Sequence, residues 1–263
     1  MMILDYHPNQ EFRAMTTVRT YPIAVSVHPT REALGLAAGA LAARHLKLAL
    51  QQHPHATVML AAAPSQAATL AALATEPDLE WSRVSSFHMD EYLGLDPEAP
   101  QGFGIWLERS FVSRVPSLTF NRMRVAGDPQ VDAEAYASRL PEGPFDVVLL
   151  GLGVNGHLAF NDPPARFDDP QDTRVVELDD VSRRQQVDEG HFATMEDVPR
   201  RAITVTIPRL LRAGHIVASV PGAEKRDAVR ATLTAAIGPN HPGTALRTHP
   251  DVTLFLDDDS APR

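Results

Sequence analysis

Short apolar runs alternate with longer amphipathic stretches along most of the chain. The apolar runs predict strands over Ile23–Val27, Thr57–Ala62, Arg83–Phe87, Arg122–Ala126, Phe145–Leu150, Ala202–Ile207, His215–Val220 and Val252–Leu256. The amphipathic stretches predict helices over Arg31–Gln52, Ser65–Thr75, Phe103–Arg114, Gln130–Leu140, Pro208–Arg212 and Ala223–Ile237. This alternation is typical of parallel strands joined by crossover helices. We therefore expect an α/β fold with a Rossmann-like, doubly wound, mostly parallel sheet and flanking helices.

Local signals agree with this pattern. Thr30 stands where a helix N-cap is expected, and Gly238 with Pro239 marks a helix end. No long linker, repeat or low-complexity tract divides the chain, so residues 1–263 are predicted to form a single domain. The segment 162–190 is rich in Pro, Asp and Arg and only weakly periodic. Because long irregular stretches in compact domains usually cover active sites, we expect a lid-like insertion there.

The composition narrows the classes of ligand and chemistry. The chain has 24 Lys and Arg residues against 33 Asp and Glu, a net charge of −9. This balance disfavours nucleic acid and anionic membranes as partners, so an anionic ligand needs a local cationic pocket. The absence of cysteine excludes disulfides, thiolate nucleophiles and Cys-ligated zinc.

Targeting signals are not evident in the sequence. The first residues, MMILDYHPNQEFRAM, lack the basic end and apolar run of a signal peptide. The most apolar stretch, Ala56–Ala74, is interrupted by Pro64, Ser65 and Gln66 and does not read as a membrane span. We expect a cytoplasmic protein.

Ligands of open α/β sheets bind beyond the carboxyl ends of the strands, so the residues that follow each strand are the candidates for a site. After Thr57–Ala62, the sequence Ala63-Pro-Ser-Gln66 opens a helix. Its free N–H groups and the Ser65 hydroxyl could hold an anion. The alternative is that Pro64 and Ser65 only start the helix.

A second corner, His88-Met-Asp90-Glu91, places two adjacent carboxylates at a strand end. A carboxylate in a partly apolar site can have a raised pKa and act as a base toward a carbon acid. The alternative is a pair of solvated loop acids. A metal site from His88, Asp90 and Glu91 is disfavoured, because neighbouring strand residues point to opposite faces.

The third corner follows Phe145–Leu150 and reads GLGVNGHLAFND, with glycine at 151, 153 and 156. Glycines allow a tight turn close to a ligand. The turn presents His157 with Asp162 five residues on, the two parts of a general acid–base relay. A loop histidine satisfied by the backbone is the alternative. The glycine spacing also fits a dinucleotide fingerprint, but it lies late in the chain without the expected acidic partner, so a nucleotide cofactor is disfavoured.

These corners, in this order, resemble the glucosamine-6-phosphate deaminase and sugar-phosphate isomerase family, over about Ile23–Asp257. Phe87–Leu95 and Gly151–Pro163 are close to its two signature blocks, and Lys225 matches its phosphate-binding lysine. The His249-Pro250 pair before the last strand matches a further motif. The related 6-phosphogluconolactonases have Arg in place of Tyr92 and a different run after the histidine, so the chain sides with the deaminases.

The resemblance implies a role for each matching residue. Asp90 would move a proton between C2 and C1 through an enediol-type intermediate, and His157 would open the pyranose ring. Asn155 would orient His157, and Asp162 falls where relatives usually carry Glu. The substrate and its phosphate would be held by these residues: Pro64, Ser65, Gln66, Glu91, Gly156 and Lys225. The implied reaction converts glucosamine 6-phosphate to fructose 6-phosphate and ammonia, with no metal or organic cofactor.

The chain also departs from the family pattern. The phosphate loop of the family is normally glycine-rich with Ser or Thr, whereas this chain has Ala61-Ala-Ala-Pro-Ser-Gln66. Fewer N–H groups are therefore free, because proline has none. Arg183 or Arg184 is expected to stand in for a lid arginine of the family. Asp162 is one methylene shorter than Glu, about 1.5 Å of reach. The sequence therefore leaves open a 6-phosphogluconolactonase-like hydrolase, another sugar-phosphate isomerase, or a non-catalytic sugar-phosphate-binding regulator, and also a homo-oligomeric state.

Overall fold

A computed structural model describes residues 22–262 of the chain. The N-terminal stretch that lacks signal-peptide features lies outside these residues. The main sheet has seven strands: β1 (Ala24–His28), β2 (Ala56–Leu60), β3 (Val84–His88), β5 (Thr119–Asn121), β6 (Phe145–Leu150), β9 (Ala213–Val220) and β10 (Val252–Asp257). A second sheet has three: β4 (Asp90–Tyr92), β7 (Thr173–Glu177) and β8 (Arg201–Val205). The helices are α1 (Arg31–Gln52), α2 (Ala67–Ala74), α3 (Phe103–Ser110), α4 (Pro129–Ala137), α5 (Asp180–Asp188), α6 (Ile207–Leu211) and α7 (Arg226–Thr234).

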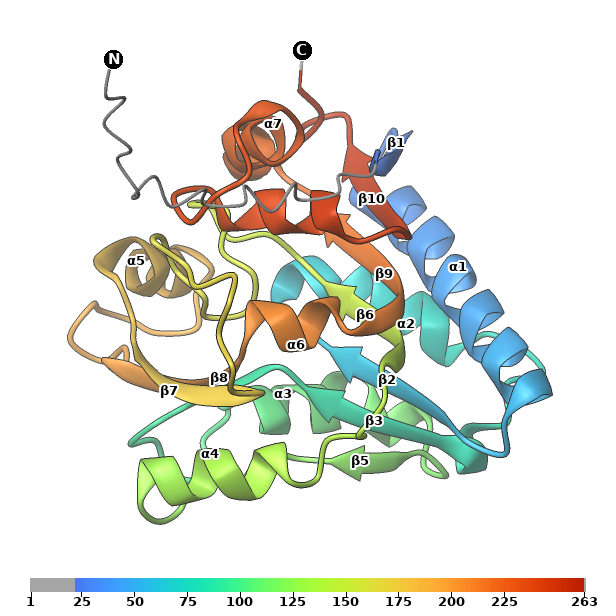
Figure 1. Cartoon of the computed structure of the whole chain (residues 1–263), viewed down its shortest axis with the longest axis horizontal. Coiled ribbons are helices and arrows are strands. Elements are labelled where there is room, and N and C mark those ends of the chain that lie inside the picture. The colour runs from blue at the N-terminus through green and yellow to red at the C-terminus, as the bar shows by residue number, and fades with distance from the viewer. Residues whose placement is uncertain (1–21, 263) are drawn as a thin grey trace, which may run out of the picture.

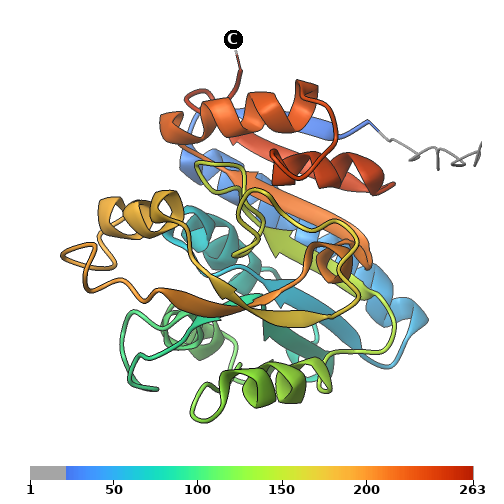
Figure 2. The same cartoon turned by 60° about the vertical axis from the view of Figure 1, so that its left-hand side comes forward.

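All neighbouring strands of the main sheet are parallel, in the order β1-β10-β9-β6-β2-β3-β5 (Figure 1 and Figure 2). From β2 the chain continues outward to β3 and β5, whereas from β6 it continues in the opposite direction to β9 and β10. The loops that leave the carboxyl ends of β2 and β6 therefore diverge and leave a crevice between them. The predicted doubly wound, mostly parallel sheet is confirmed.

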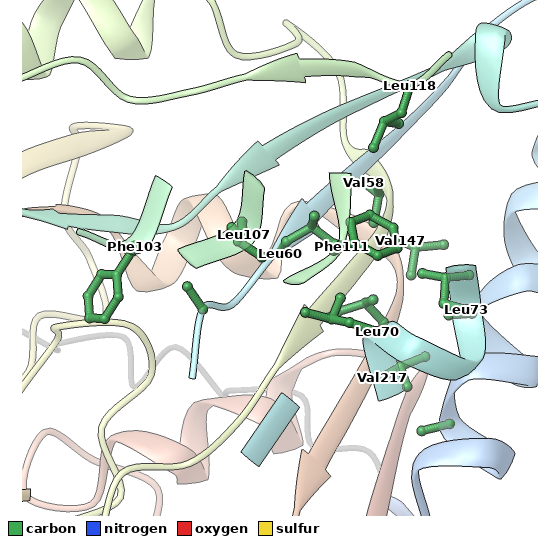
Figure 3. Packing of buried hydrophobic residues seen from close by; sticks show 14 of the residues in the cluster. Val58, Leu60, Leu70, Leu73, Phe103, Leu107, Phe111, Leu118, Val147 and Val217 are labelled. Carbon is green, nitrogen blue, oxygen red and sulfur yellow. The ribbon is translucent and has the colours of Figure 1, made fainter. Parts of the chain in front are cut away.

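Apolar residues pack on both faces of this sheet because successive strand side chains alternate between faces. Val58 and Val147 belong to the cluster that includes α1, α2 and α3 (Figure 3). Met59 and Val148 belong to the opposite cluster, which includes residues of α4, α6 and α7. Strands buried on both faces explain why they appear in the sequence as short continuous apolar runs.

Two strand predictions need correction. The strand predicted at Arg122–Ala126 is wrong, because β5 ends at Asn121. The Met123 N–H donates to the buried His88 ring instead of to a neighbouring strand. The strand predicted at Ala202–Ile207 exists as β8, but it pairs antiparallel with β4 and β7 and is outside the main sheet.

The segment 162–190, predicted to be irregular, contains β7 and α5 (Figure 1). The side chain of Asp179 caps α5 by accepting the N–H of Ser182 at 2.7 Å. The buried positions of α5 are polar, namely Ser182, Arg183, Gln185 and Gln186. A helix whose buried face is polar gives no apolar periodicity, which is why the sequence did not reveal it.

Helix α1 is the long core helix of the fold. Among residues 22–262 it alone is long and apolar enough to span a membrane, with a mean hydropathy of 1.3, but half of that window is buried inside the protein. Thr30 caps it as predicted, accepting the N–H of Ala33 at 3.1 Å. Where α1 crosses α2, a Cβ atom added to Gly39 would lie 2.7 Å from the Cβ of Ala72. Glycine is therefore required by the close approach of the two helices.

We predict that Gly39→Ala destabilises the protein by about 1–3 kcal/mol, the usual cost of overpacking a tight contact. Helix propensity alone would act in the opposite direction, since alanine favours helix by about 1 kcal/mol over glycine. Urea unfolding measures the change, and Ala40→Gly at the adjacent exposed position is the control for propensity. A Gly39→Ala variant at least as stable as the wild type would contradict the packing argument.

Candidate active site

The crevice between β2 and β6 holds a cleft lined by groups from six parts of the chain. These are the loops after β2 (61–66) and β6 (151–160), residues 89–90 after β3, Phe103 of α3, one face of α5 and its C-terminal end, and Lys225. The open space between them is about 60 Å³. This volume holds only a few water molecules, and the cleft also opens to solvent.

Asp90 lies at the start of β4 with its carboxylate facing the cleft. It is only 7% exposed, and within residues 22–262 no protein group donates a hydrogen bond to its carboxylate. Burial, and secondarily the charge of Glu91, raises the pKa of Asp90 well above its usual value. Such a carboxyl can take up and release a proton at a pH closer to neutral than a solvated aspartate can.

His88 fixes the backbone beside this carboxyl. Its Nε2 accepts the N–H of Met123 at 2.7 Å, so the ring proton is on Nδ1, which donates to the carbonyl of Asp90 at 2.9 Å. Complete burial lowers the pKa of His88 to about 3, so the ring is neutral. Both nitrogens are therefore occupied by the backbone, and His88 does not converge with Asp90 and Glu91 on a common ligand.

Glu91 points away from the cleft, as alternation along β4 requires. Its carboxylate accepts the N–H groups of Tyr92, Phe103 and Gly104 at 3.0, 3.0 and 2.9 Å. It thus caps the N-terminus of α3 in place of a side chain from the preceding loop. Glu91, which was predicted to hold the substrate, does not line the cleft.

The glycine-rich turn after β6 brings His157 to the cleft. The N–H of Gly153 donates to the carbonyl of His157 at 3.0 Å, and the N–H of Gly156 donates to the carbonyl of Gly153 at 2.9 Å. Gly156 has a φ of +83°, a conformation that favours glycine. A Cβ atom at Gly153 would overlap the imidazole of His157. Gly153 therefore supplies the space for the ring, whereas Gly156 shapes the turn and does not line the cleft.

Asp162 holds His157 from behind. Its Oδ1 lies 3.0 Å from Nδ1 of His157, so the shorter side chain reaches the ring despite its missing methylene. Burial by itself would raise the pKa of Asp162. The hydrogen bond and the charge of His157, together with the hydrogen bonds from Ser182 and Asn155, lower that pKa to about 2. Because Nδ1 faces Asp162, Nε2 is the nitrogen that a ligand in the cleft would meet.

Asn155 and Ser182 complete the surroundings of this pair. The Asn155 side-chain oxygen accepts the N–H of His157 at 3.0 Å, and its Nδ2 donates to Asp162 at 3.1 Å. The Ser182 hydroxyl donates to Asp162 and lies 2.8 Å from Nδ1 of His157. The sequence pointed to Asn155 but not to Ser182. The available signal was Asp179, an N-cap residue three positions before Ser182.

Two glutamines of α5 also line the cleft and were not expected. The side-chain oxygen of Gln186 accepts the hydroxyl of buried Tyr92 at 2.8 Å. The side-chain oxygen of Gln185 accepts the N–H of Val154 at 3.0 Å. These bonds tie α5 to β4 and to the glycine-rich turn, so α5 forms one wall of the cleft.

The predicted phosphate loop is only partly arranged as expected. Ser65 and Gln66 line the cleft, whereas Pro64 does not. The Gln66 amide is buried and donates to the Ser219 carbonyl at 3.0 Å and to the Ser65 hydroxyl at 3.2 Å. Gln66 therefore connects the β2 loop to the end of β9, and its side-chain N–H groups donate to groups of the protein itself.

Lys225 is 2% exposed and lines the cleft, and its Nζ lies 3.6 Å from the carboxylate of Glu189. Neither arginine expected from the lid region joins it. The Arg183 guanidinium contacts Asp180 and the carbonyls of Met195 and Val198. Arg184 also lies outside the cleft lining.

Comparison with known proteins identifies the family of this chain. Residues 29–254 match the family model of glucosamine-6-phosphate isomerases/6-phosphogluconolactonase. The chain is 33% identical over 196 residues to a glucosamine-6-phosphate deaminase of Halothermothrix orenii, covering 73% of this chain and 80% of that protein. It is 34% identical over 183 residues to one of Streptococcus pneumoniae serotype 4, covering 69% and 77% of the two chains.

Solved structures show the same fold. A monomeric glucosamine-6-phosphate deaminase superposes with a TM-score of 0.82 at 27% identity, covering 90% of this chain and 98% of that one. A 6-phosphogluconolactonase from Shewanella baltica superposes with a TM-score of 0.75 at 17% identity, covering 89% and 97%. The match over residues 29–254 and the relatives above 30% identity establish that this chain belongs to the family of glucosamine-6-phosphate isomerases and 6-phosphogluconolactonases.

Proposed function

We propose that this protein is an enzyme of the glucosamine-6-phosphate deaminase type, which converts an amino-sugar phosphate into a ketose phosphate and ammonia. One observation carries the proposal. Asp90, a buried carboxyl to which no group within residues 22–262 donates a hydrogen bond, and His157, held from behind by Asp162, face the same cleft. A proton transfer between adjacent carbons and a proton transfer at a ring oxygen require two such groups. The curated relatives named glucosamine-6-phosphate deaminase support the same activity.

The geometry suggests the order of steps. Nε2 of His157 transfers a proton at the ring oxygen and opens the pyranose, while Asp162 holds Nδ1 and stabilises positive charge on the ring. Asp90 then removes the proton from C2 while O1 gains a proton, which gives an enolamine. Asp90 delivers the proton to C1 and the amino nitrogen loses a proton, which leaves an imine at C2. Water adds to that carbon, the C–N bond breaks, and ammonia leaves with the ketose phosphate as the other product.

Asn155 and Ser182 act in this scheme as positioning residues, since each contacts Asp162 and His157 from outside the cleft lining. Lys225 and Ser65 are the proposed contacts of the phosphate. The same proposal includes action without a cofactor and a cytoplasmic location. It also includes a single domain in which residues 162–190 cover the active site. The 6-phosphogluconolactonase neighbour supports the fold alone, at 17% identity.

Asp90→Asn tests the central assignment. The amide keeps the shape of the side chain but cannot accept the C2 proton, so we expect kcat to fall by at least about 100-fold, while binding of a sugar phosphate changes little. Ammonia release from glucosamine 6-phosphate measures turnover, and calorimetry measures binding. Asp258→Asn at an exposed position is the control and should retain activity. Near-normal turnover of Asp90→Asn would remove Asp90 as the base, and lactone hydrolysis without ammonia release would replace the proposed activity.

Glu91→Gln tests how the charge of Glu91 affects the pKa of Asp90, at a residue that does not line the cleft. The charge of Glu91 is the second cause, after burial, of the raised pKa of Asp90. Without it the pKa of Asp90 falls, so Asp90 stays ionised to lower pH and the acidic limb of kcat/KM moves to lower pH. Profiles of kcat/KM against pH for both proteins measure the shift. Glu108→Gln is the control, and an acidic limb that stays in place or moves upward in Glu91→Gln is the contrary result.

A further inference from the structure

Lys225 is the group of the cleft to which an anionic ligand would bind. Within residues 22–262, no other lysine or arginine lines it. Lys225 ends the 3-10 turn Ala223–Lys225 that precedes α7, and it is 2% exposed. A buried ammonium group needs an anionic partner, because it has lost most of its hydration.

That partner is Glu189, immediately after α5. Its Oε1 lies 3.6 Å from Nζ of Lys225 and accepts the side-chain N–H of Gln185 at 2.6 Å. Its Oε2 lies 3.9 Å from Nε2 of His191. The Glu189 carboxylate is therefore held against Lys225, and both residues line the cleft.

A substrate phosphate near Lys225 would meet this carboxylate. Asp90 and Glu189 already bring two acidic side chains to the cleft against the one ammonium group of Lys225. A phosphate would add negative charge close to Glu189, and like charges at such separations repel. The nearby neutral donors are fewer than a glycine-rich loop would give, because Pro64 has no N–H and the Gln66 amide is engaged.

We infer that Glu189 is a specificity-determining residue that occupies the place of the substrate phosphate at Lys225 and competes with it. This inference rests on the proposed function for the identity of the substrate, but the competition itself concerns only Lys225, Glu189 and an anion. Phosphate binding then includes the separation of Glu189 from Lys225, with movement of the end of α5 out of the cleft. The open space of about 60 Å³ is consistent with this requirement.

The test uses inorganic phosphate as the probe, so that binding is measured independently of turnover. Calorimetric titration of the full chain compares wild type with Glu189→Gln, which removes the competing charge and keeps the side-chain length. We expect the Kd for phosphate to fall by about tenfold, the factor that one charged hydrogen bond commonly represents. Glu224→Gln is the matched control, because Glu224 is exposed, lies beside Lys225 in sequence and does not line the cleft. It should change the Kd by less than about twofold, as expected for an exposed charge.

A second variant shows that the effect passes through Lys225. In the Lys225→Ala background, Glu189→Gln should tighten phosphate binding by much less than in the wild-type background, because only the direct repulsion between Glu189 and the phosphate is then removed. In the wild-type background, the KM for glucosamine 6-phosphate should fall by a factor similar to that of the phosphate Kd, while kcat changes less.

The outcomes separate the two proposals. Unchanged or weaker phosphate binding by Glu189→Gln overturns the role of Glu189, and so does equal tightening by Glu224→Gln or the absence of measurable binding to both proteins. Tighter phosphate binding with no ammonia release by any of the proteins overturns the proposed function and leaves the competition standing. Ammonia release with unchanged phosphate binding overturns only the inference about Glu189.

Discussion

The candidate site depends on one constraint, the divergence of the chain at two adjacent parallel strands. Because β2 continues toward β3 while β6 continues toward β9, the chain leaves these two adjacent strands in opposite directions. The helix-opening loop that carries Ser65 and the glycine-rich turn that carries His157 therefore form opposite sides of one cleft. The proposed chemistry needs both sides, and neither side alone supplies an acid–base group together with an anion contact.

The cleft and its wall contain two carboxyl groups whose surroundings differ. Burial and, secondarily, the charge of Glu91 raise the pKa of Asp90 well above its usual value. Asp162 is surrounded by His157, Ser182 and Asn155, and their hydrogen bonds lower its pKa to about 2. Carboxyl groups whose environments shift their pKa values in opposite directions can take different roles in one reaction. Here Asp90 is suited to exchange a proton, and Asp162 is suited to remain ionised beside His157.

Helix α5 joins these parts. It contributes Ser182 to the surroundings of His157, Gln185 and Gln186 to the cleft wall, and at its end Glu189 to the environment of Lys225. Its buried face is polar, so it is stabilised by specific hydrogen bonds to β4 and to the glycine-rich turn more than by apolar packing. A wall held in this way can separate from the cleft without exposing a large apolar surface.

The sequence by itself determined the doubly wound sheet. Strands buried on both faces appear as short apolar runs, and their alternation with amphipathic helical stretches is visible in the sequence. It also located Asp90 and His157, since short motifs at strand ends carry these groups to a common edge, and the resemblance to the family added Lys225. Only the tertiary structure decided that β8 pairs with β4, that Arg122–Ala126 is not a strand, and that Glu91 caps α3. It also decided that Gln66 is engaged, that no arginine of the described residues 22–262 lines the cleft, and that Glu189 faces Lys225. The physical reason is that these features depend on contacts between polar groups far apart in the chain, which leave no periodic pattern in the sequence.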